Sequence, residues 1–510
     1  MQARSLALII LLPFAAHAAP VIPKDGMILK ESATLEPGTY ALPHGIVIGA
    51  DNVTLDAKGA VFTGGGDGQA VFVKGNNGVT IRGLEASRYK WGVRVEGGKN
   101  IKVQDCRIRD TPEAPPDDTW LDIWLGPKDA YGGAIILFDV KGGLVSGNDV
   151  QHQQNGVMMY SCSGLTVEKN NASFQSGFGI HMYGSSDNIV QDNIADWCNR
   201  IHKRGERYYY PGADATGILM VVNCSRNKIL RNFFRGGGDG VFVAGYNPDL
   251  GKVPCNDNLF EDNDCSYSPN NAFEATFCKG NIFRNNRAGF SNYGFWLGYS
   301  IDTKIEGNEV RRNRIAGIAI EHGLRNEIAD NHLSSNGRGI ALWANAAAQF
   351  NAAWPDQATS ANNVIRGNSV CANGIGLLVK VEGQVTPKSR PHDDTVSGNT
   401  FYGNDVGALV MNADAEVIKG NRFENNTVAG LRLESNAKAS ITGNAFADQP
   451  LNAWSDSAGV WDGNQWAGAV NGPVSIAGGP GKDEHPAKEV TAPASTTLST
   501  MMDVLRGTPR

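Results

Sequence analysis

The chain has 510 residues, of which 41% are hydrophobic and 19% are charged, and this apolar share excludes a wholly disordered protein. Its formal net charge is −6. Because general nucleic-acid binders are usually basic, nucleic acid is not an expected partner. The 62 glycines exceed the usual share of about 7%, but they do not recur at every third residue, which excludes collagen.

The first residues have the pattern of an export signal. Arg4 supplies a positive charge, residues 6–14 form an apolar run, and Ala16 and Ala18 make a small-x-small cleavage site. This pattern predicts a secretory signal peptide over residues 1–18 and a mature protein in the periplasm or outside the cell. The run is too short to cross a bilayer, and no later segment has the ~18 apolar residues of a membrane helix. We therefore expect no membrane span.

A short pattern, Asn followed by four residues and a second Asn, recurs along the chain. Clear copies end at Asn193, Asn232, Asn263, Asn286, Asn331 and Asn368, and degenerate copies end at Asn148, Asn170, Asn308, Asn399, Asn421 and Asn444. Many neighbouring copies are 22 or 23 residues apart, and the longer steps indicate loop insertions. Such a period predicts a solenoid, in which each coil buries its apolar side chains against its neighbours.

A strand pattern that usually opens with Gly precedes each copy. The first and third residues after the Gly position are apolar, as in Val157 and Met159, Ile180 and Met182, Phe295 and Leu297, and Ile318 and Ile320. This period of two predicts a strand with one buried and one outward face. The chain is therefore predicted to be all-β, with one right-handed parallel β-helix over residues 19–477. Residues 478–510 are rich in Pro, Ala, Thr and charge and are expected to form a flexible tail.

The repeats resemble those of the pectate-lyase-like superfamily of carbohydrate-active β-helix proteins, over roughly residues 25–470. The opening segment LEPGTYAL…GIVIGADNVTLDAKGA also resembles the start of such domains. Members include polysaccharide lyases, uronan C5-epimerases, glycoside hydrolases and periplasmic proteins that assist maturation of nitrous oxide reductase. The resemblance implies a polysaccharide or oligosaccharide partner but does not select one activity. The Asp-Pro-His-Asp signature of alginate epimerases is absent, since His392 lies in RPHDD.

The outward strand positions predict a groove lined by aromatic and polar side chains. Its predicted members are Tyr160, His181, Tyr183, Glu274, Trp296, Glu321, Trp343 and Lys380. Aromatic rings offer flat faces that suit sugar rings. The alternative to an open groove is that loops pack over these rings and form a second small core. Insertions at residues 110–132, 198–216, 246–256, 344–361 and 381–393 are expected to wall the groove.

The favoured function is an exported enzyme that cleaves glycosidic bonds with paired carboxylates. Glu274 and Glu321 point outward two coils apart, which places their Cα atoms roughly 11–12 Å apart. Their side chains could then approach the ~6.5–9.5 Å separation of an inverting glycosidase. Asp239, in the segment GGGDGV, is a third catalytic candidate. Solvated carboxylates without a catalytic role are the alternative for each.

Two other functions stay open. A uronan lyase or C5-epimerase would use His181 and Tyr183 for proton transfer, with Arg204 and Arg207 of the second insertion neutralising the substrate carboxylate. A non-catalytic periplasmic protein would bind glycans or assist metal maturation, and Met158 beside His181 offers soft ligands of the kind copper prefers. No Asp cluster has convincing calcium spacing, so no metal or other cofactor is predicted, although calcium stays possible.

Three cysteines fall in one column of the repeat. Cys224, Cys255 and Cys278 each precede the first Asn of their coil by three residues. Adjacent coils place Cα atoms ~4.8 Å apart, inside the ~4.4–6.8 Å disulfide window. This spacing predicts a disulfide from Cys255 to Cys224 or Cys278, with a column of reduced thiols as the alternative. Cys106 falls in the Asn column and is expected to be a core thiol.

Overall fold

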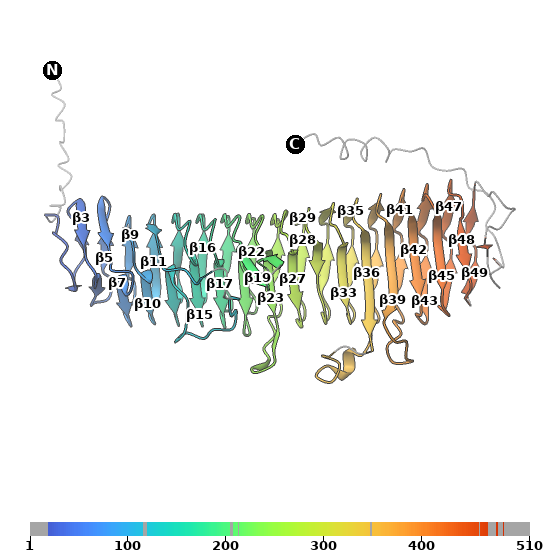
Figure 1. The fold of residues 1–510 in the computed structure, drawn as a ribbon, viewed down its shortest axis with the longest axis horizontal. Coiled ribbons are helices and arrows are strands. Elements are labelled where there is room, and N and C mark those ends of the chain that lie inside the picture. Colours follow the sequence, from blue (N-terminus) through green and yellow to red (C-terminus); the bar gives the residue numbers. More distant parts are fainter. Residues whose placement is uncertain are drawn as a thin grey trace, which may run out of the picture.

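The structure, a computed structural model, describes residues 19–115, 120–204, 208–212, 214–346, 349–457, 459–467, 476–477 and 483, with only the backbone at residues 202–204, 208–211 and 476–477. It is one elongated right-handed parallel β-helix whose strands stack coil upon coil along the long axis (Figure 1). The predicted signal peptide at residues 1–18 and most of the predicted tail lie outside the described residues.

The first face of the solenoid carries the strands that the Gly-led pattern predicts. Each strand pairs in parallel with the strand of the next coil, so that Phe242 lies opposite Glu274, and Glu274 opposite Trp296. Its strands are β1 (Met27–Leu29), β4 (Ile46–Ile48), β7 (Gln69–Lys74), β10 (Trp91–Glu96), β13 (Gly133–Phe138), β15 (Val157–Tyr160), β17 (Phe178–Tyr183), β21 (Thr216–Val221), β23 (Asp239–Ala244), β27 (Asn271–Thr276), β30 (Tyr293–Trp296), β33 (Ala316–Glu321), β36 (Arg338–Asn345), β39 (Ile375–Glu382), β42 (Val406–Met411), β45 (Ala429–Glu434), β48 (Ala453–Ser455) and β51 (Ile476–Ala477).

The second face is built from the strands that follow in each coil, again in parallel register. They are β2 (Ala33–Thr34), β5 (Thr54–Asp56), β8 (Thr80–Arg82), β11 (Lys99–Gln104), β14 (Lys141–Ser146), β16 (Ser163–Glu168), β18 (Ile189–Gln191), β22 (Lys228–Leu230), β26 (Leu259–Glu261), β28 (Ile282–Arg284), β31 (Lys304–Glu306), β34 (Glu327–Ala329), β37 (Val364–Arg366), β40 (Thr395–Ser397), β43 (Glu416–Lys419), β46 (Ala439–Thr442) and β49 (Gly459–Asp462). These strands hold the residues between the two Asn of the repeat pattern.

The third face consists of two sheets that isolated parallel bridges connect from Arg107 to Arg287. Its strands are β3 (Gly38–Ala41), β6 (Ala60–Thr63), β9 (Glu85–Ser87), β12 (Arg107–Arg109), β29 (Arg287–Gly289), β32 (Glu309–Arg311), β35 (His332–Ser334), β38 (Ser369–Cys371), β41 (Thr400–Tyr402), β44 (Arg422–Glu424), β47 (Ala445–Ala447) and β50 (Gln465–Trp466). The insertions add two antiparallel hairpins, β19 (Ile201–Arg204) with β20 (Tyr208–Pro211) and β24 (Tyr246–Asn247) with β25 (Gly251–Lys252), and the short 3₁₀ helix η1 (Pro355–Gln357).

The core runs through the centre of the solenoid and contains the side chains that the period-two pattern places inside. Val157, Ile180, Ile218, Phe295 and Ile318 are all fully buried in it. Phe260, Phe273, Phe283 and Phe295 extend the stack, and the rings of Phe273 and Phe295 lie 4.8 Å apart. The predicted register is therefore confirmed, since a one-residue shift would have turned these side chains to solvent.

Asparagine ladders run along the three corners between the faces. At the corner after the second face, the Asn263 backbone N–H and Nδ2 both donate to Oδ1 of Asn286, at 2.9 and 3.1 Å. Nδ2 of Asn263 also donates to the Ile229 carbonyl at 2.8 Å. The same pattern joins Asn258 to Asn281 at the corner before the second face, and Asn313 to Asn336 after the third. Each ladder thus satisfies buried amide groups where the backbone turns.

The predicted disulfide is wrong, because all eight cysteines are free, buried thiols. Cys224, Cys255 and Cys278 do lie in one column, and the Cys224 backbone N–H donates to Sγ of Cys255 at 3.3 Å. Cys224 and Cys278 donate their own thiols to the carbonyls of Val221 and Thr276, both at 3.1 Å. These thiols therefore act as rungs of an interior hydrogen-bonded column. Cys106 is buried as predicted, and its backbone N–H donates to Asn148 Oδ1.

One residue of the predicted tail takes part in the solenoid. Asp483 forms a bridge with Trp461, and its carboxylate accepts from the Asn464 N–H and from Trp466 Nε1, at 3.2 and 2.8 Å. It thus adds a rung to the ladder of Asn444 and Asn464. Among the described residues, no helix has the length and apolar character that crossing a membrane requires.

Candidate active site

Two carboxyl groups from neighbouring coils meet on the outer side of the first face. Asp239 begins β23, and Glu274 lies inside β27. Two asparagines hold them: Asn271 donates its backbone N–H to Asp239 Oδ1 at 2.8 Å and its Nδ2 to Glu274 Oε2 at 2.6 Å. Asn270 Nδ2 donates to the same Asp239 oxygen at 3.0 Å. Within the described part of the chain, the other oxygen of Asp239 has no hydrogen-bond partner.

These carboxyl groups line a cleft of about 450 Å³. Its walls come from the first insertion and from the strands below it: Trp120, Leu121, Asp122, Ile123, Trp124, Asp214, Asp239, Phe242, Asn270 and Glu274. Asp214 anchors the insertion, because its carboxylate accepts from the Leu121 backbone N–H. The cleft therefore combines aromatic walls with carboxyl groups, as a sugar-binding site requires.

Burial changes the acidity of both acids. It raises the pKa of Glu274 to about 7, against a smaller opposing effect of the Asn271 hydrogen bond. Burial also raises the pKa of Asp239 well above its usual value, and the nearby charge of Glu274 raises it further. Because two neighbouring carboxylates resist ionising together, the pair holds a proton near neutral pH.

The first insertion also covers part of the predicted groove. Tyr160 and His181 are fully buried, and the ring of His181 lies 5.2 Å from those of Tyr160 and Phe178. Tyr183 is half-buried against Tyr160. Within the described residues neither His181 nitrogen has a hydrogen-bond partner, and burial lowers its pKa to about 3. Here the expectation of an open face is wrong, because the loop packs on these rings as a second small core.

Glu321 does not join the pair as the sequence predicted. It lies at the end of β33 opposite Trp343, and it does not line the cleft of Asp239 and Glu274. A separate hollow of about 130 Å³ lies on this part of the face, lined by Trp343, Lys380 and eight other residues. Trp296 packs against Trp343 with ring centres 5.5 Å apart, and Lys380 forms an ion pair with Glu382 at 3.2 Å.

The predicted basic residues of the second insertion fall largely outside the described structure. Arg204 ends strand β19, where only the backbone is described, and Arg207 lies outside the described residues. The neighbouring Arg200 is buried, and it donates to the carbonyls of Ala114 and Pro115 at 3.4 and 2.8 Å. Arg200 thus binds the first insertion to the solenoid.

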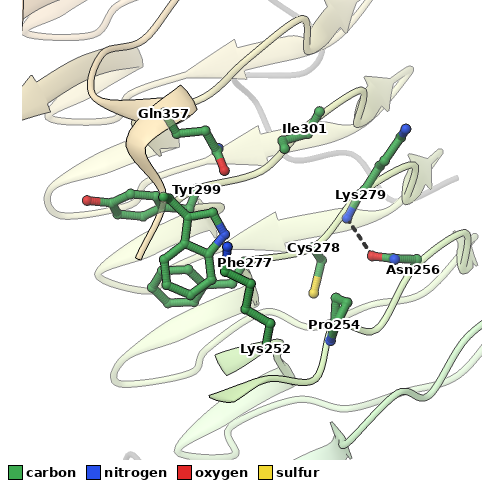
Figure 2. Close-up of a pocket in the computed structure, with 10 residues that line it drawn as sticks. Lys252, Pro254, Asn256, Phe277, Cys278, Lys279, Tyr299, Ile301 and Gln357 are labelled. Atoms are coloured by element: carbon green, nitrogen blue, oxygen red, sulfur yellow. Dashed lines mark hydrogen bonds between the residues drawn. The ribbon is translucent and has the colours of Figure 1, made fainter. Parts of the chain in front are cut away.

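Three later insertions leave the opposite edge of the first face, after β23, β36 and β39, and the last two project visibly in Figure 1. Two of them meet over a hollow of about 150 Å³, whose lining Figure 2 shows. The Trp354 ring lies 4.6 Å from that of Phe277 and 4.7 Å from that of Tyr246, with the Lys252 ammonium 4.8 Å from its centre. This aromatic cluster fixes the wall at that edge.

Sequence reasoning missed Asp122, Asp214 and Asn270, which line the cleft, and Asn271, which holds both carboxyl groups. Asn271 begins β27, and Asp214 lies two residues before β21. Asp122 lies in an insertion whose path over the face no periodic signal specifies. The one usable signal was the spacing of Asp239 and Asn271, which lie on neighbouring strands that pair in parallel, so that the Asn271 N–H reaches the Asp239 carboxylate.

Family comparisons match almost the whole solenoid. A model described as "right handed beta helix region" matches residues 44–234. A second model, described as "periplasmic copper-binding protein (NosD)", matches residues 210–350 and 358–482, together more than half of the chain. No curated protein matches the sequence.

Several solved structures show a similar fold. The periplasmic alginate epimerase AlgG is 12% identical over 89% of this chain and 79% of its own, with a TM-score of 0.33. The A-module of the Azotobacter vinelandii mannuronan C-5 epimerase AlgE4 is 13% identical over 72% and 88%, with a TM-score of 0.34. DFA-IIIase from Arthrobacter chlorophenolicus A6 is 12% identical over 66% and 85%, also with a TM-score of 0.34. Likenesses this weak assign no role to any residue.

Proposed function

The chain belongs to the family described as periplasmic copper-binding protein (NosD), and from the chemistry of its own residues we propose that it is an exported enzyme that hydrolyses glycosidic bonds. Asp239 and Glu274 are its catalytic carboxyl groups. The observation that carries the proposal is the pair itself, a buried Asp239 beside a half-buried Glu274, held by asparagines in a cleft with tryptophan walls.

The residues do not fit a copper site of the kind the family description suggests. In the described ranges, no group of three or more His, Cys, Asp or Glu side chains is close enough to hold a metal ion. Met158 and His181 are buried beneath the first insertion, and Met159 and Met182 are in the core. Burial raises the pKa of the Cys255 thiol well above its usual value and that of Cys278 to about 12, so these thiols stay protonated, whereas metals bind thiolates.

The carboxyl pair suits hydrolysis because it can hold one proton and one charge. The protonated member donates its proton to the leaving glycosidic oxygen. The ionised member either takes a proton from the water that attacks the anomeric carbon, or attacks that carbon itself and is then released by water. Asn270 and Asn271 fix both groups, and their amide hydrogen bonds stabilise the charge that remains. Trp120 and Trp124 face the same cleft and supply apolar surface for the sugar.

The lyase or epimerase alternative lacks an accessible base at the predicted place. His181 is enclosed by Tyr160 and Phe178, and Tyr183 packs against Tyr160. Proton abstraction requires the base to reach the substrate directly or through one water molecule. The buried ring of His181, which does not line the cleft of Asp239 and Glu274, is therefore a poor candidate for that base.

Substitution of the pair tests this function. Glu274→Gln and Asp239→Asn keep the shape but remove proton transfer, so activity should fall by ~10²–10⁴-fold. The measurement is release of reducing ends from β-glucan, xylan, mannan, inulin, polygalacturonate and alginate, with thermal unfolding as the check on folding. Glu321→Gln, outside the cleft, is the matched control. An inactive Glu321→Gln beside an active Glu274→Gln, or unsaturated products, would contradict the proposal.

The pH profile of the parent enzyme should reflect the shared proton. Burial raises the pKa of Glu274 to about 7, and burial together with the charge of Glu274 raises the pKa of Asp239 well above its usual value. Glu274 therefore ionises as the pH rises through about 7 while Asp239 keeps its proton, and below that pH both acids are protonated. Hydrolysis should therefore decline as the pH falls below about 7, in initial rates measured from pH 4 to 9. A rate that is highest near pH 4 would contradict this division of roles.

A further inference from the structure

A row of outward side chains connects the cleft to the separate hollow on the same face. Glu274 on β27 lies opposite Trp296 on β30, and Trp296 lies opposite Ala319 on β33. Ala319 in turn lies opposite Ala341 on β36, and both alanines line the hollow. Because neighbouring coils are ~4.8 Å apart, the hollow lies ~10–14 Å from Glu274 along the axis of the solenoid.

Three aromatic rings span the distance between the two sites. The ring centre of Trp296 lies 4.8 Å from that of Tyr293 and 5.5 Å from that of Trp343. Tyr293 and Trp343 line the hollow, and all three side chains are only partly buried. The floor beneath them consists of the buried side chains of Ala319, Ala341 and Leu378. Aromatic surface therefore continues from the coil next to Glu274 as far as the hollow.

Polar side chains complete the lining of the hollow. Arg338, Lys380 and Glu382 contribute a guanidinium, an ammonium and a carboxylate group, and the last two form an ion pair at 3.2 Å. Burial raises the pKa of Tyr293, and the charges of Arg338 and Glu382 act on it in opposite directions, since both lie near the phenol. Sugar hydroxyls can accept from such cations and donate to such a carboxylate.

The size of the hollow suits one sugar of a longer chain. Its volume is about 130 Å³, whereas pockets that enclose a whole small ligand have ~300–1,000 Å³. Aromatic faces with polar groups at their edges match a sugar ring, which has apolar faces and hydroxyls around its rim. The hollow is thus suited to hold one residue of a polymer whose reacting part lies elsewhere.

We propose that the hollow is a distal subsite for the glycan chain that the cleft cleaves, so that the enzyme acts on chains long enough to reach it in preference to short oligosaccharides. This inference rests on the proposed function and names its substrate class. A chain that extends along the solenoid from Glu274 passes Trp296 and places a sugar against Trp343. The contacts made there hold the chain in position over the carboxyl pair.

The dependence of binding and cleavage on chain length tests the inference. The probes are a graded series of oligosaccharides, from the disaccharide upward, of the panel glycan that binds the Glu274→Gln variant most tightly. Binding is measured by calorimetry on that variant, and kcat/KM on the parent enzyme. Both should increase with length until the chain spans the ~10–14 Å to the hollow, and then level off. Affinity that is already maximal for the disaccharide overturns the inference.

Variants of the hollow identify the source of the length dependence. Trp343→Ala removes a ring, and Arg338→Met removes the guanidinium group but keeps the aromatic wall. Each should lower kcat/KM for the long probes by about 3–10-fold, mainly through KM, because a remote sugar makes the same contacts in the bound substrate and in the transition state. The short probes should not respond.

A tryptophan elsewhere on the first face provides the matched control. Trp454 lies on β48, three coils beyond β39, with its ring 5.2 Å from the Arg432 guanidinium. Trp454→Ala should leave kcat/KM unchanged for long and short probes, and thermal unfolding checks the folding of all three variants. Equal losses on long and short probes, or no loss in either variant of the hollow, show that the hollow is not a subsite.

The outcomes separate this inference from the proposed function. If long chains bind more tightly than short ones through Trp343 but the parent enzyme cleaves none of them, hydrolysis is contradicted and the subsite stands. If the parent enzyme cleaves short and long chains equally well, hydrolysis stands and the subsite is wrong. If no oligosaccharide of the series binds, both are wrong.

Discussion

Asp394 and Glu416 occupy successive rungs where the ladder before the second face would otherwise continue with asparagine. Oδ1 of Asp394 accepts from the backbone N–H and from Nδ2 of Asn363, at 2.7 and 3.0 Å. Within the described residues, its Oδ2 and both carboxyl oxygens of Glu416 have no partner. A protonated carboxyl group resembles an amide in having one acceptor and one donor. These rungs therefore suit the neutral acids, and burial raises the pKa of Asp394 to about 7 and that of Glu416 well above its usual value.

The stability of the protein should depend on pH through these two acids. Because the folded pKa of Asp394 lies above its unfolded value, its stabilising contribution is full below about pH 4 and is lost as the pH rises through about 7. Asp394→Asn should therefore raise the free energy of unfolding at pH 8, on the order of 1–3 kcal/mol, with little effect at pH 4.

Urea unfolding of the parent and the variant at both pH values measures this effect. Asp330→Asn, at an exposed position, is the control and should change the free energy of unfolding by less than ~0.5 kcal/mol. If Asp394→Asn is equally destabilised at both pH values, the fold requires the carboxyl group of Asp394 and the prediction is wrong.

At the scale of the element, each coil consists of strands too short to be stable alone. β22, β26 and β28 have only three residues each, and a strand of this length gains its stability from the strands on either side. The asparagine ladders fix how neighbouring coils align, because each Asn contacts the coil before it and the coil after it. A ladder residue therefore affects three coils.

Removing one rung should be costly despite the small size of the side chain. Asn263→Ala deprives the backbone N–H and Nδ2 of Asn232 of their acceptor and the Ile229 carbonyl of a donor. Since these groups are buried, we expect a loss of about 2–4 kcal/mol in the free energy of unfolding. Lys228→Ala, on an exposed position of β22, should stay within ~0.5 kcal/mol in the same urea titration. Equal effects of the two variants would contradict the role of the ladder.

At the scale of the whole molecule, seven of the eight cysteines belong to one continuous core, and Cys371 is buried outside it. Their thiols donate to backbone carbonyls or pack among aliphatic side chains, and none of them is exposed. The solenoid is therefore held together by packing and hydrogen bonds along its length.

A reducing agent should accordingly leave the stability of the protein unchanged. We expect the unfolding midpoint to be the same with and without dithiothreitol. Titration with a thiol reagent should detect eight thiols after unfolding in urea and almost none in the folded protein, since burial prevents both ionisation and access. Detection of only six thiols after unfolding without reductant would show that the protein contains one disulfide.

The sequence predicted the repetitive part of this molecule well because one physical rule recurs in every coil. Alternation placed Val157, Ile180 and Phe295 inside, and the spacing of the asparagines gave the length of the coil. The same rule could not predict that residues of the first insertion would cover Tyr160 and His181, since the path of an insertion depends on contacts that do not repeat. The cleft itself could not be predicted for a related reason: the repeat placed Glu274 and Glu321 two coils apart, but the insertion that forms the cleft lies over Asp239, and Glu321 does not line it.

The carboxyl pair and the tryptophan walls have separate structural origins. Asp239 and Glu274 lie on adjacent strands of a rigid sheet, so the coil repeat sets their separation, whereas Trp120 and Trp124 belong to a loop attached between β12 and β13. Exchanging this loop would change the walls of the cleft without moving the two carboxyl groups. The fold thus offers protein engineers, and natural recombination, a way to vary one wall of a cleft while the opposite wall is inherited intact.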